Sequence, residues 1–305
     1  MKVEDIQNIL IIGAGTMGLQ IGLLCATHGY DVAIYDIDPA MVKKAVERTK
    51  ALAERFSQKN RLPPEAAGQA LARISFTSDP KVGGRNADLV SESVPEDPVL
   101  KGKIFAQLDD ICPPQTIFTT NTSSLVPSMF AKATGRPERF LAFHFHDVLQ
   151  TDVVDIMPHP GTLPEVVDLV RAFAEKIGQI PIMLKKEHHG YVFNTMLMSF
   201  LGEALSMASK GVASIEDIDR AWMGVMHTQV GPFGIMDSVG LDTVWKITAY
   251  WAEKRQDPKA RKNADFIKKH IDKGLLGQKS GQGFYSYPDP AFARRGFLKG
   301  KKIAV

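Results

Sequence analysis

The fold of this chain is decided by residues 8–36, which read NILIIGAGTMGLQIGLLCATHGYDVAIYD. A strand-like apolar run leads directly into three closely spaced glycines. A helical pattern follows, and then a second apolar run that ends on Asp36. This order of strand, glycine loop, helix and strand is typical of a βαβ unit whose first turn binds a dinucleotide.

Each glycine in the loop has its own role in such a unit. Gly13 allows the tight turn out of the strand, Gly15 lets the backbone approach a pyrophosphate, and Gly18 lets the helix pack on the sheet. Thr16 and Met17 begin the helix, whose free N–H groups would face the phosphates. A glycine-rich structural turn is the competing interpretation, but it would not need the flanking strand and helix.

Asp36 indicates which dinucleotide is bound. It follows Gly13 by 23 residues, close to the spacing of about 20 expected for an acid that binds an adenosine ribose diol. A 2′-phosphate would be repelled by this carboxylate, and no basic residue lies between Asp36 and Lys43. We therefore expect NAD rather than NADP.

Length, net charge and cysteine spacing limit the classes of protein to which the chain can belong. The 305 residues suggest two domains, and a net charge of +3 gives no reason to expect a nucleic-acid partner. Cys25 and Cys112 have no disulfide or metal-ligand spacing, so we expect reduced thiols and no metal site. Because neither a signal peptide nor a membrane span is evident, we expect a cytoplasmic protein.

Strand and helix patterns alternate in residues 1–186, which predicts a Rossmann-type doubly wound α/β sheet that binds NAD. Strands are expected at residues 9–12, 32–35, 89–90, 117–120, 141–145, 153–157 and 180–184. Helices are expected between them, at residues 17–28, 39–56, 64–74, 100–108 and 164–177.

Residues 187–305 contain only helical patterns, so we expect an all-helical C-terminal domain for substrate binding and dimerisation. The expected helices are residues 192–209, 215–223, 241–254 and 263–273. Met196, Met198 and Met207 give the first of these helices an apolar surface that favours a core or a homodimer interface over a ligand site.

Candidate catalytic residues follow the later strands. His144 lies near the end of a strand, where a general base would sit beside the cofactor. Asp155 on the next strand would orient it, although Asp152 competes for this role. The run Asn121-Thr122-Ser123-Ser124 offers hydroxyls to a reacting oxygen or to the nicotinamide, and Asn194 would close over the substrate.

The remaining histidines near these candidates have a simpler interpretation. His146, His159, His188 and His189 are expected on the surface or in loops. The structural alternatives for the candidates are a buried structural His144 and a turn or helix cap at residues 121–124.

Taken together, the motifs resemble the L-3-hydroxyacyl-CoA dehydrogenase family, in its short bacterial 3-hydroxybutyryl-CoA dehydrogenase form. The resemblance covers nearly the whole chain. Its motifs are GAGTMG at residues 13–18, ESVPE at 92–96, NTSSL at 121–125, FHF at 143–145, GYVFN at 190–194, GPFG at 231–234, VGLD at 239–242 and KSGQGFY at 279–285.

The resemblance implies a catalytic set in which Ser123, His144 and Asn194 match family residues. It also implies that Glu92, Glu96 and Lys101 lie near the nicotinamide half of NAD, with Asn121 beside them. Lys59 matches a lysine that meets CoA phosphates.

The chain departs from the family pattern around the substrate. The family usually has His-Phe-Phe-Asn-Pro followed by a glutamate, whereas this chain has His144-Phe145-His146-Asp147-Val148 and then Asp155. Leu52 replaces a serine that accompanies the lysine in CoA binding, and Thr195 replaces a common arginine.

The expected activity is NAD-dependent oxidation of a short 3-hydroxyacyl-CoA to the 3-oxoacyl-CoA, and the reverse. Two alternatives remain. The chain could act on a free 3-hydroxy acid, as relatives that oxidise L-gulonate or carnitine do, or it could be a non-catalytic NAD-binding protein similar to λ-crystallin.

Overall fold

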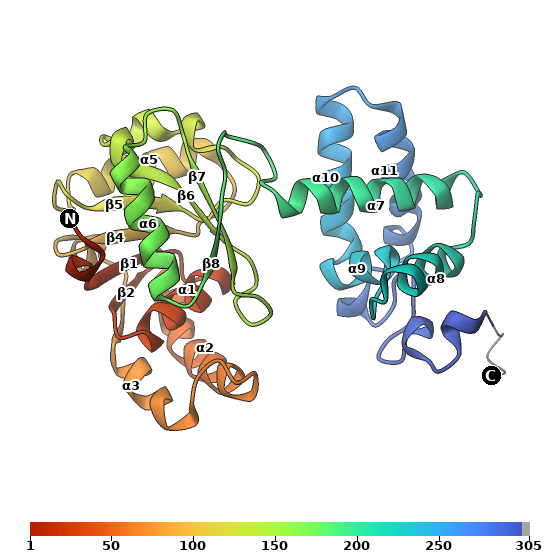
Figure 1. The fold of residues 1–305 in the computed structure, drawn as a ribbon, viewed down its shortest axis with the longest axis horizontal. Coiled ribbons are helices and arrows are strands. Elements are labelled where there is room, and N and C mark those ends of the chain that lie inside the picture. The colour runs from red at the N-terminus through yellow and green to blue at the C-terminus, as the bar shows by residue number, and fades with distance from the viewer. Residues whose placement is uncertain (301–305) are drawn as a thin grey trace. The chain divides into compact units, whose positions relative to one another are not determined.

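A computed structural model describes residues 1–300 of the chain. It divides into two compact units, the first spanning Met1–Asn194 and the second beginning at Thr195 (Figure 1). The first unit contains the sheet, and the second is helical, so the expected fold class is confirmed.

The first unit is built on one eight-stranded sheet in the order β3-β2-β1-β4-β5-β6-β7-β8. All neighbouring strands are parallel except β6 and β7. The strands are β1 (Asn8–Ile12), β2 (Asp31–Tyr35), β3 (Ile74–Thr77), β4 (Leu89–Glu92), β5 (Ile117–Thr120), β6 (Phe140–Phe145), β7 (Val153–Pro158) and β8 (Ile180–Met183).

Helices connect the strands and make up most of the second unit. In the first unit they are α1 (Thr16–Thr27), α2 (Pro39–Gln58), α3 (Ala67–Ala72), α4 (Pro80–Gly84), α5 (Pro98–Asp109) and α6 (Pro164–Lys176). They continue with α7 (Phe193–Ser209), α8 (Ile215–Met226), α9 (Pro232–Val239), α10 (Leu241–Lys254) and α11 (Pro258–Ile271).

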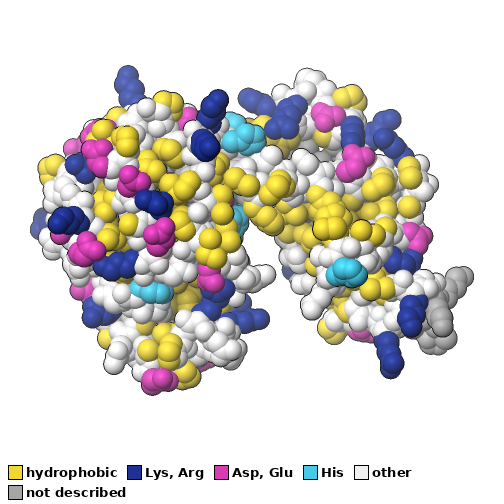
Figure 2. All heavy atoms as spheres, viewed as in Figure 1, with side chains coloured by type: hydrophobic (Ala, Val, Ile, Leu, Met, Phe, Trp, Pro, Cys, Tyr) yellow, Lys and Arg dark blue, Asp and Glu magenta, His cyan; other side chains and the backbone are white. Residues whose placement is uncertain are grey.

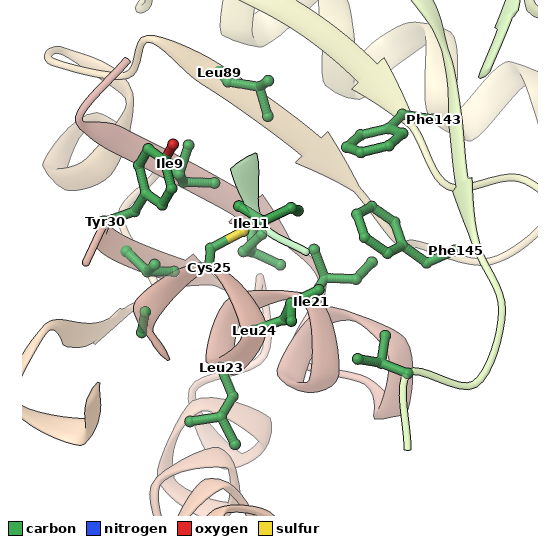
Figure 3. Packing of buried hydrophobic residues seen from close by; sticks show 14 of the residues in the cluster. Ile9, Ile11, Ile21, Leu23, Leu24, Cys25, Tyr30, Leu89, Phe143 and Phe145 are labelled. Atoms are coloured by element: carbon green, nitrogen blue, oxygen red, sulfur yellow. The ribbon is translucent and has the colours of Figure 1, made fainter. Parts of the chain in front are cut away.

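The two faces of the sheet carry separate cores, because successive side chains of a strand point to opposite sides. On β1, Ile9 and Ile11 join the core that α1, α2 and α6 cover. Figure 3 shows this packing, with Cys25 and Leu24 of α1 beside Ile11 and Phe143 and Phe145 of β6 nearby. Leu10 and Ile12 enter the other core, with α5.

The observed elements differ from the expected ones at the helix of residues 64–74 and at three elements that were not predicted, β3, α4 and α9. The expected helix at residues 64–74 is a short turn followed by α3, and its last residue begins the unexpected edge strand β3. β3 has only four residues and no buried position, so it lacks a hydrophobic pattern. Helix α9 was also missed, because its N-cap Gly231 and its first residue Pro232 resemble a loop.

The second unit encloses a core of its own, which Leu205, Phe233 and Tyr285 help to form. Beside this core lie two fully buried carboxylates, Asp219 and Asp237. Asp219 accepts hydrogen bonds from the backbone N–H groups of Phe233 and Gly234 and from the Tyr285 hydroxyl, at 2.9, 3.2 and 2.9 Å. These bonds tie α8 to the start of α9 and to the C-terminal loop.

Asp237 continues the same arrangement. It accepts from the backbone N–H groups of Phe284 and Tyr285, both at 2.9 Å, and from the Tyr287 hydroxyl at 3.1 Å. We call Asp219, Asp237, Tyr285 and Tyr287 the Asp219 cluster. Gly283 packs so closely that a Cβ there would lie 2.1 Å from Asp237 Oδ1.

Among the described residues, none of the helices combines the length and apolar character needed to cross a membrane.

Candidate active site

Sheet topology gathers the candidate residues at one edge. Because β1, β4, β5 and β6 run parallel, their carboxyl ends meet at the same side of the sheet. β7 runs antiparallel to β6, so the beginning of β7 lies there too. Open α/β sheets bind ligands at this edge.

The glycine loop after β1 has the shape that a dinucleotide needs. Gly13 has φ +101°, and a Cβ there would lie 2.7 Å from the Ser93 carbonyl oxygen. A Cβ on Gly18 would lie 1.9 Å from the Gly13 carbonyl oxygen, so α1 can pack only with glycine there.

Gly15 differs from the other two glycines, because a Cβ there would meet no atom within 4 Å. It is the N-cap of α1 and supplies no side-chain hydrogen bond to the first turn, which Thr16 and Met17 begin. The free N–H groups of this turn and the open space at Gly15 fit the pyrophosphate of NAD.

Asp36 lies at the end of β2, where a ribose-binding acid is expected. Its carboxylate accepts hydrogen bonds from the backbone N–H groups of Ala14 at 2.9 Å and Asp38 at 3.0 Å. These bonds fix the partly exposed carboxylate against the glycine loop.

Arg48 was missed by the sequence analysis. From α2 its guanidinium donates to the Ala14 carbonyl oxygen at 3.3 Å and to Thr16 Oγ1 at 3.4 Å. Its position three turns into a helix gave no local sign that it reaches the glycine loop.

A buried ion pair closes the carboxyl end of β4. Lys101 Nζ lies 2.6 Å from Glu92 Oε1, and the two side chains are 1% and 0% exposed. Glu92 also accepts from Val94 N and Thr120 Oγ1. Burial raises the pKa of Glu92, although the Lys101 charge and these hydrogen bonds act against it.

Glu96 organises the loop that carries Ser123. Its carboxylate accepts from Thr122 Oγ1 at 2.8 Å, from Ser123 N at 2.8 Å and from Ser123 Oγ at 3.3 Å. It also lies 3.4 Å from Lys101 Nζ. Burial acts to raise the pKa of Glu96, but Lys101 and these hydrogen bonds outweigh burial and lower it.

Asn121 fixes the neighbouring strand ends, because its Oδ1 accepts from Phe145 N at 2.7 Å. It thereby joins the loop after β5 to the end of β6.

His144 and Asp155 are register partners on β6 and β7, so their side chains share one face of the sheet. His144 Nδ1 lies 3.1 Å from Asp155 Oδ2, and both side chains are buried. Burial acts to raise the pKa of Asp155, but the close contacts with His144 and His146 and their charges outweigh it and lower the pKa. Asp152 instead pairs with Arg61.

His146 is in a loop, as expected, but it does not lie on the surface. Its side chain is 16% exposed, and its Nε2 lies 3.2 Å from Asp155 Oδ2. This contact does not have the geometry of a hydrogen bond, so Nε2 has no hydrogen-bond partner among residues 1–300. The Tyr191 ring packs on His144, with the ring centroids 4.8 Å apart.

Two further candidates, Lys59 and Asn194, lie outside this group of contacts, as does Leu52, which replaces a serine of the family. Lys59 is exposed at the C-terminal end of α2. Leu52 is 8% exposed and belongs to the core. Asn194 is the second residue of α7, at the end of the first unit.

A doubly wound sheet, a glycine loop shaped for a dinucleotide and a buried imidazole–carboxylate pair at the same edge define an NAD-dependent dehydrogenase. The chain belongs to the 3-hydroxyacyl-CoA dehydrogenase family. The NAD binding domain of this family matches residues 8–188, and its C-terminal domain matches residues 190–287.

Individual relatives extend over almost the whole chain. A probable 3-hydroxybutyryl-CoA dehydrogenase of Bacillus subtilis (strain 168) is 33% identical, over 93% of this chain and 99% of that protein. The structure of (S)-3-hydroxybutyryl-CoA dehydrogenase from Ralstonia eutropha is 31% identical with a TM-score of 0.83, over 93% and 100%. A diketoreductase structure, described as acting on dicarbonyl compounds, is 38% identical with a TM-score of 0.87, over 92% and 99%.

Proposed function

We propose that this enzyme interconverts a short-chain 3-hydroxyacyl-CoA and the corresponding 3-oxoacyl-CoA with NAD. The observation that carries the proposal is the buried contact of 3.1 Å between His144 and Asp155 at the edge of the sheet where the glycine loop opens. A dehydrogenase that oxidises an alcohol needs a base at this place.

His144 would take the proton of the 3-hydroxyl through Nε2, because Nδ1 faces Asp155. The Asp155 carboxylate would hold the proton on Nδ1 and stabilise the imidazolium that forms. When bound, NAD supplies the acceptor for the hydride that leaves C3.

Ser123 and Asn194 would position the oxygen atoms of the substrate. Glu96 would fix the Ser123 loop through its hydrogen bonds to the Ser123 backbone and hydroxyl. Glu96 and Lys101 would lie beside the nicotinamide half of NAD, with Glu92 holding Lys101 in place.

Lys59 would meet the phosphates of CoA, and its exposed position on the first unit supports this role. A Lys59→Ala variant should raise KM for a thioester substrate and leave KM for an acid without CoA unchanged. Lys44→Ala, another exposed lysine of α2, is the matched control.

A free 3-oxo or 3-hydroxy acid is the second candidate substrate. The similarity to a diketoreductase favours it, and so does Leu52, which is in the core where the family has a CoA-binding serine.

NADH consumption separates the two candidates when acetoacetyl-CoA and free acetoacetate are compared at equal concentration. Turnover of the thioester alone supports the acyl-CoA proposal. Turnover of acetoacetate with no preference for the thioester contradicts it and favours the second candidate.

We further propose that the helical domain at residues 187–305 forms a homodimer. Hydrophobic side chains gather over the part of the second unit where α7 and α8 lie (Figure 2). Met196, Val225 and Met226 are 60%, 76% and 54% exposed there, and exposed apolar side chains of this kind favour an interface.

The two buried free thiols support a reducing compartment, for which we propose the cytoplasm.

A further inference from the structure

Three potential metal ligands meet at the proposed catalytic pair. The ligand atoms of His144, His146 and Asp155 all lie within 4.8 Å of one another. We call these residues the His–His–Asp triad. No metal site was expected from the sequence, and His146 was expected on the surface or in a loop.

The distances within the triad approach those of a tetrahedral metal site. His144 Nδ1 and His146 Nε2 lie 3.1 and 3.2 Å from the same Asp155 oxygen. Zn²⁺ binds nitrogen and oxygen ligands at about 2.0–2.2 Å, which separates two tetrahedral ligands by roughly 3.4 Å. Small side-chain shifts would therefore admit the ion.

The hydrogen bonds of the triad leave one nitrogen without a partner. His144 contacts Asp155 in hydrogen-bond geometry, whereas His146 Nε2 is buried and has none. A buried polar atom without a partner costs free energy, and a cation between the three side chains would satisfy His146 Nε2.

We propose that the triad is a binding site for Zn²⁺ or a similar first-row divalent ion, and that the ion inhibits the dehydrogenase. Two imidazoles and one carboxylate suit such ions better than Mg²⁺ or Ca²⁺. His146 is the most exposed of the three side chains, at 16%, so a water molecule could complete the coordination on its side.

Inhibition follows from the two nitrogens of His144. An ion on Nδ1 displaces the proton that this atom shares with Asp155, and the neutral imidazole then carries its proton on Nε2. Nε2 has no lone pair left to take the hydroxyl proton of a substrate. The ion and the working tautomer of His144 therefore exclude each other.

Metal binding is measured without substrate, by titrating the full chain with Co²⁺ and following its visible absorption, and with Zn²⁺ by calorimetry. We expect one ion per chain and the intense bands of a tetrahedral Co²⁺ site. His146→Gln, which keeps much of the side-chain volume, and His146→Phe should each weaken binding about 10-fold or more.

His227→Asn is the matched control, because His227 is an exposed histidine of the second unit with a left-handed backbone that asparagine tolerates. This variant should bind Co²⁺ as the parent does, and NADH fluorescence should show that each variant retains its fold. The inference is overturned if the parent binds no stoichiometric ion, or if both His146 variants bind it equally well.

A second readout tests the inhibition. Micromolar Zn²⁺ should suppress NADH-dependent turnover, a chelator should restore it, and His146→Gln should need about 10-fold more Zn²⁺ for the same loss. Stoichiometric binding that leaves turnover unchanged would overturn the inhibitory role. Because the Co²⁺ titration needs no substrate, failure of the proposed acyl-CoA activity would not affect it.

Discussion

Each unit of the molecule holds a pair of carboxylates, and the partners of the two pairs differ. Glu92, Asp219 and Asp237 are fully buried, whereas the Glu96 side chain is 38% exposed. In the first unit, Glu92 and Glu96 share the ammonium of Lys101. In the second unit, Asp219 and Asp237 have only hydroxyl and backbone N–H donors. None of these hydrogen bonds comes from a cationic side chain that would balance the two negative charges.

The pKa shifts reflect this difference at Glu96 but not at Glu92, whose pKa burial raises despite the charge of Lys101. Burial raises the pKa of Asp219 to about 6 and also raises that of Asp237. Lys101 and hydrogen bonds overcome burial at Glu96 and lower its pKa. A shifted pKa alone does not locate a functional site. The type of partner and the place in the fold distinguish the carboxylates at the ligand-binding edge of the sheet from the Asp219 cluster, whose hydrogen bonds hold the second unit together.

The largest expected effect concerns Asp155. Asp155→Asn should lower kcat by about 10³-fold, because an amide no longer holds the proton on His144 Nδ1 or stabilises the imidazolium. Steady-state kinetics with acetoacetyl-CoA measures this loss. Asp152→Asn is the control, since Asp152 pairs with Arg61. Equal losses in the two variants would contradict the assignment of Asp155.

The second largest effect is expected when the Lys101 charge is removed from the first unit. Lys101→Met leaves Glu92 buried without its counter-ion and should cost about 3–5 kcal/mol of unfolding free energy. Urea unfolding monitored by far-UV circular dichroism measures this cost. Lys103→Met, on the exposed side of α5, should cost less than about 0.5 kcal/mol. A small effect of Lys101→Met would mean that Glu92 becomes protonated at little cost.

The pH dependence of the second unit should be somewhat smaller. The pKa of Asp219 is about 6 in the folded chain and about 3.9 in an unfolded one. The folded state therefore retains a proton that the unfolded state has released between about pH 4 and pH 6. Stability falls as the pH rises through this window, by about 3 kcal/mol at about 1.4 kcal/mol per pKa unit.

Tryptophan fluorescence in urea reports on this change, because Trp222, Trp245 and Trp251 all belong to the second unit. The decrease from pH 4 to pH 6 should be smaller in Asp219→Asn, which removes the titrating group but not the other pH-dependent groups. The same decrease in both proteins would show that Asp219 does not cause it.

The smallest expected effect concerns a single hydroxyl. Tyr285→Phe removes one donor from Asp219 and should cost about 1–3 kcal/mol, measured by the same fluorescence in urea. Tyr250→Phe is the control, because Tyr250 is 57% exposed. A stabilised Tyr285→Phe variant would contradict a structural role for the Asp219 cluster.

The sequence was sufficient for the parts of the fold that depend on local pattern. Long apolar periods and the glycine loop predicted β1, α1 and β2, because these features are encoded by neighbouring residues. β3 and α9 could not be found this way, because β3 is short and half-polar and α9 begins at a proline that directly follows a glycine.

The candidate site was predictable only in part, since its contacts depend on strand register and on side-chain reach. The sequence favoured Asp155 and left Asp152 as a competitor, and the β6–β7 register places Asp155 opposite His144. His146 could have been noticed, because residues two apart near a strand end share a face. Arg48 could not, since its contact depends on how α2 packs.

The most direct test of this account is turnover by His144→Gln, measured as NADH oxidation with acetoacetyl-CoA alongside the affinity for NADH. We predict that kcat falls by about 10³-fold or more, while NADH binding stays within about threefold of the parent protein. Turnover within about tenfold of the parent, with NADH binding intact, would contradict His144 as the group that moves the proton.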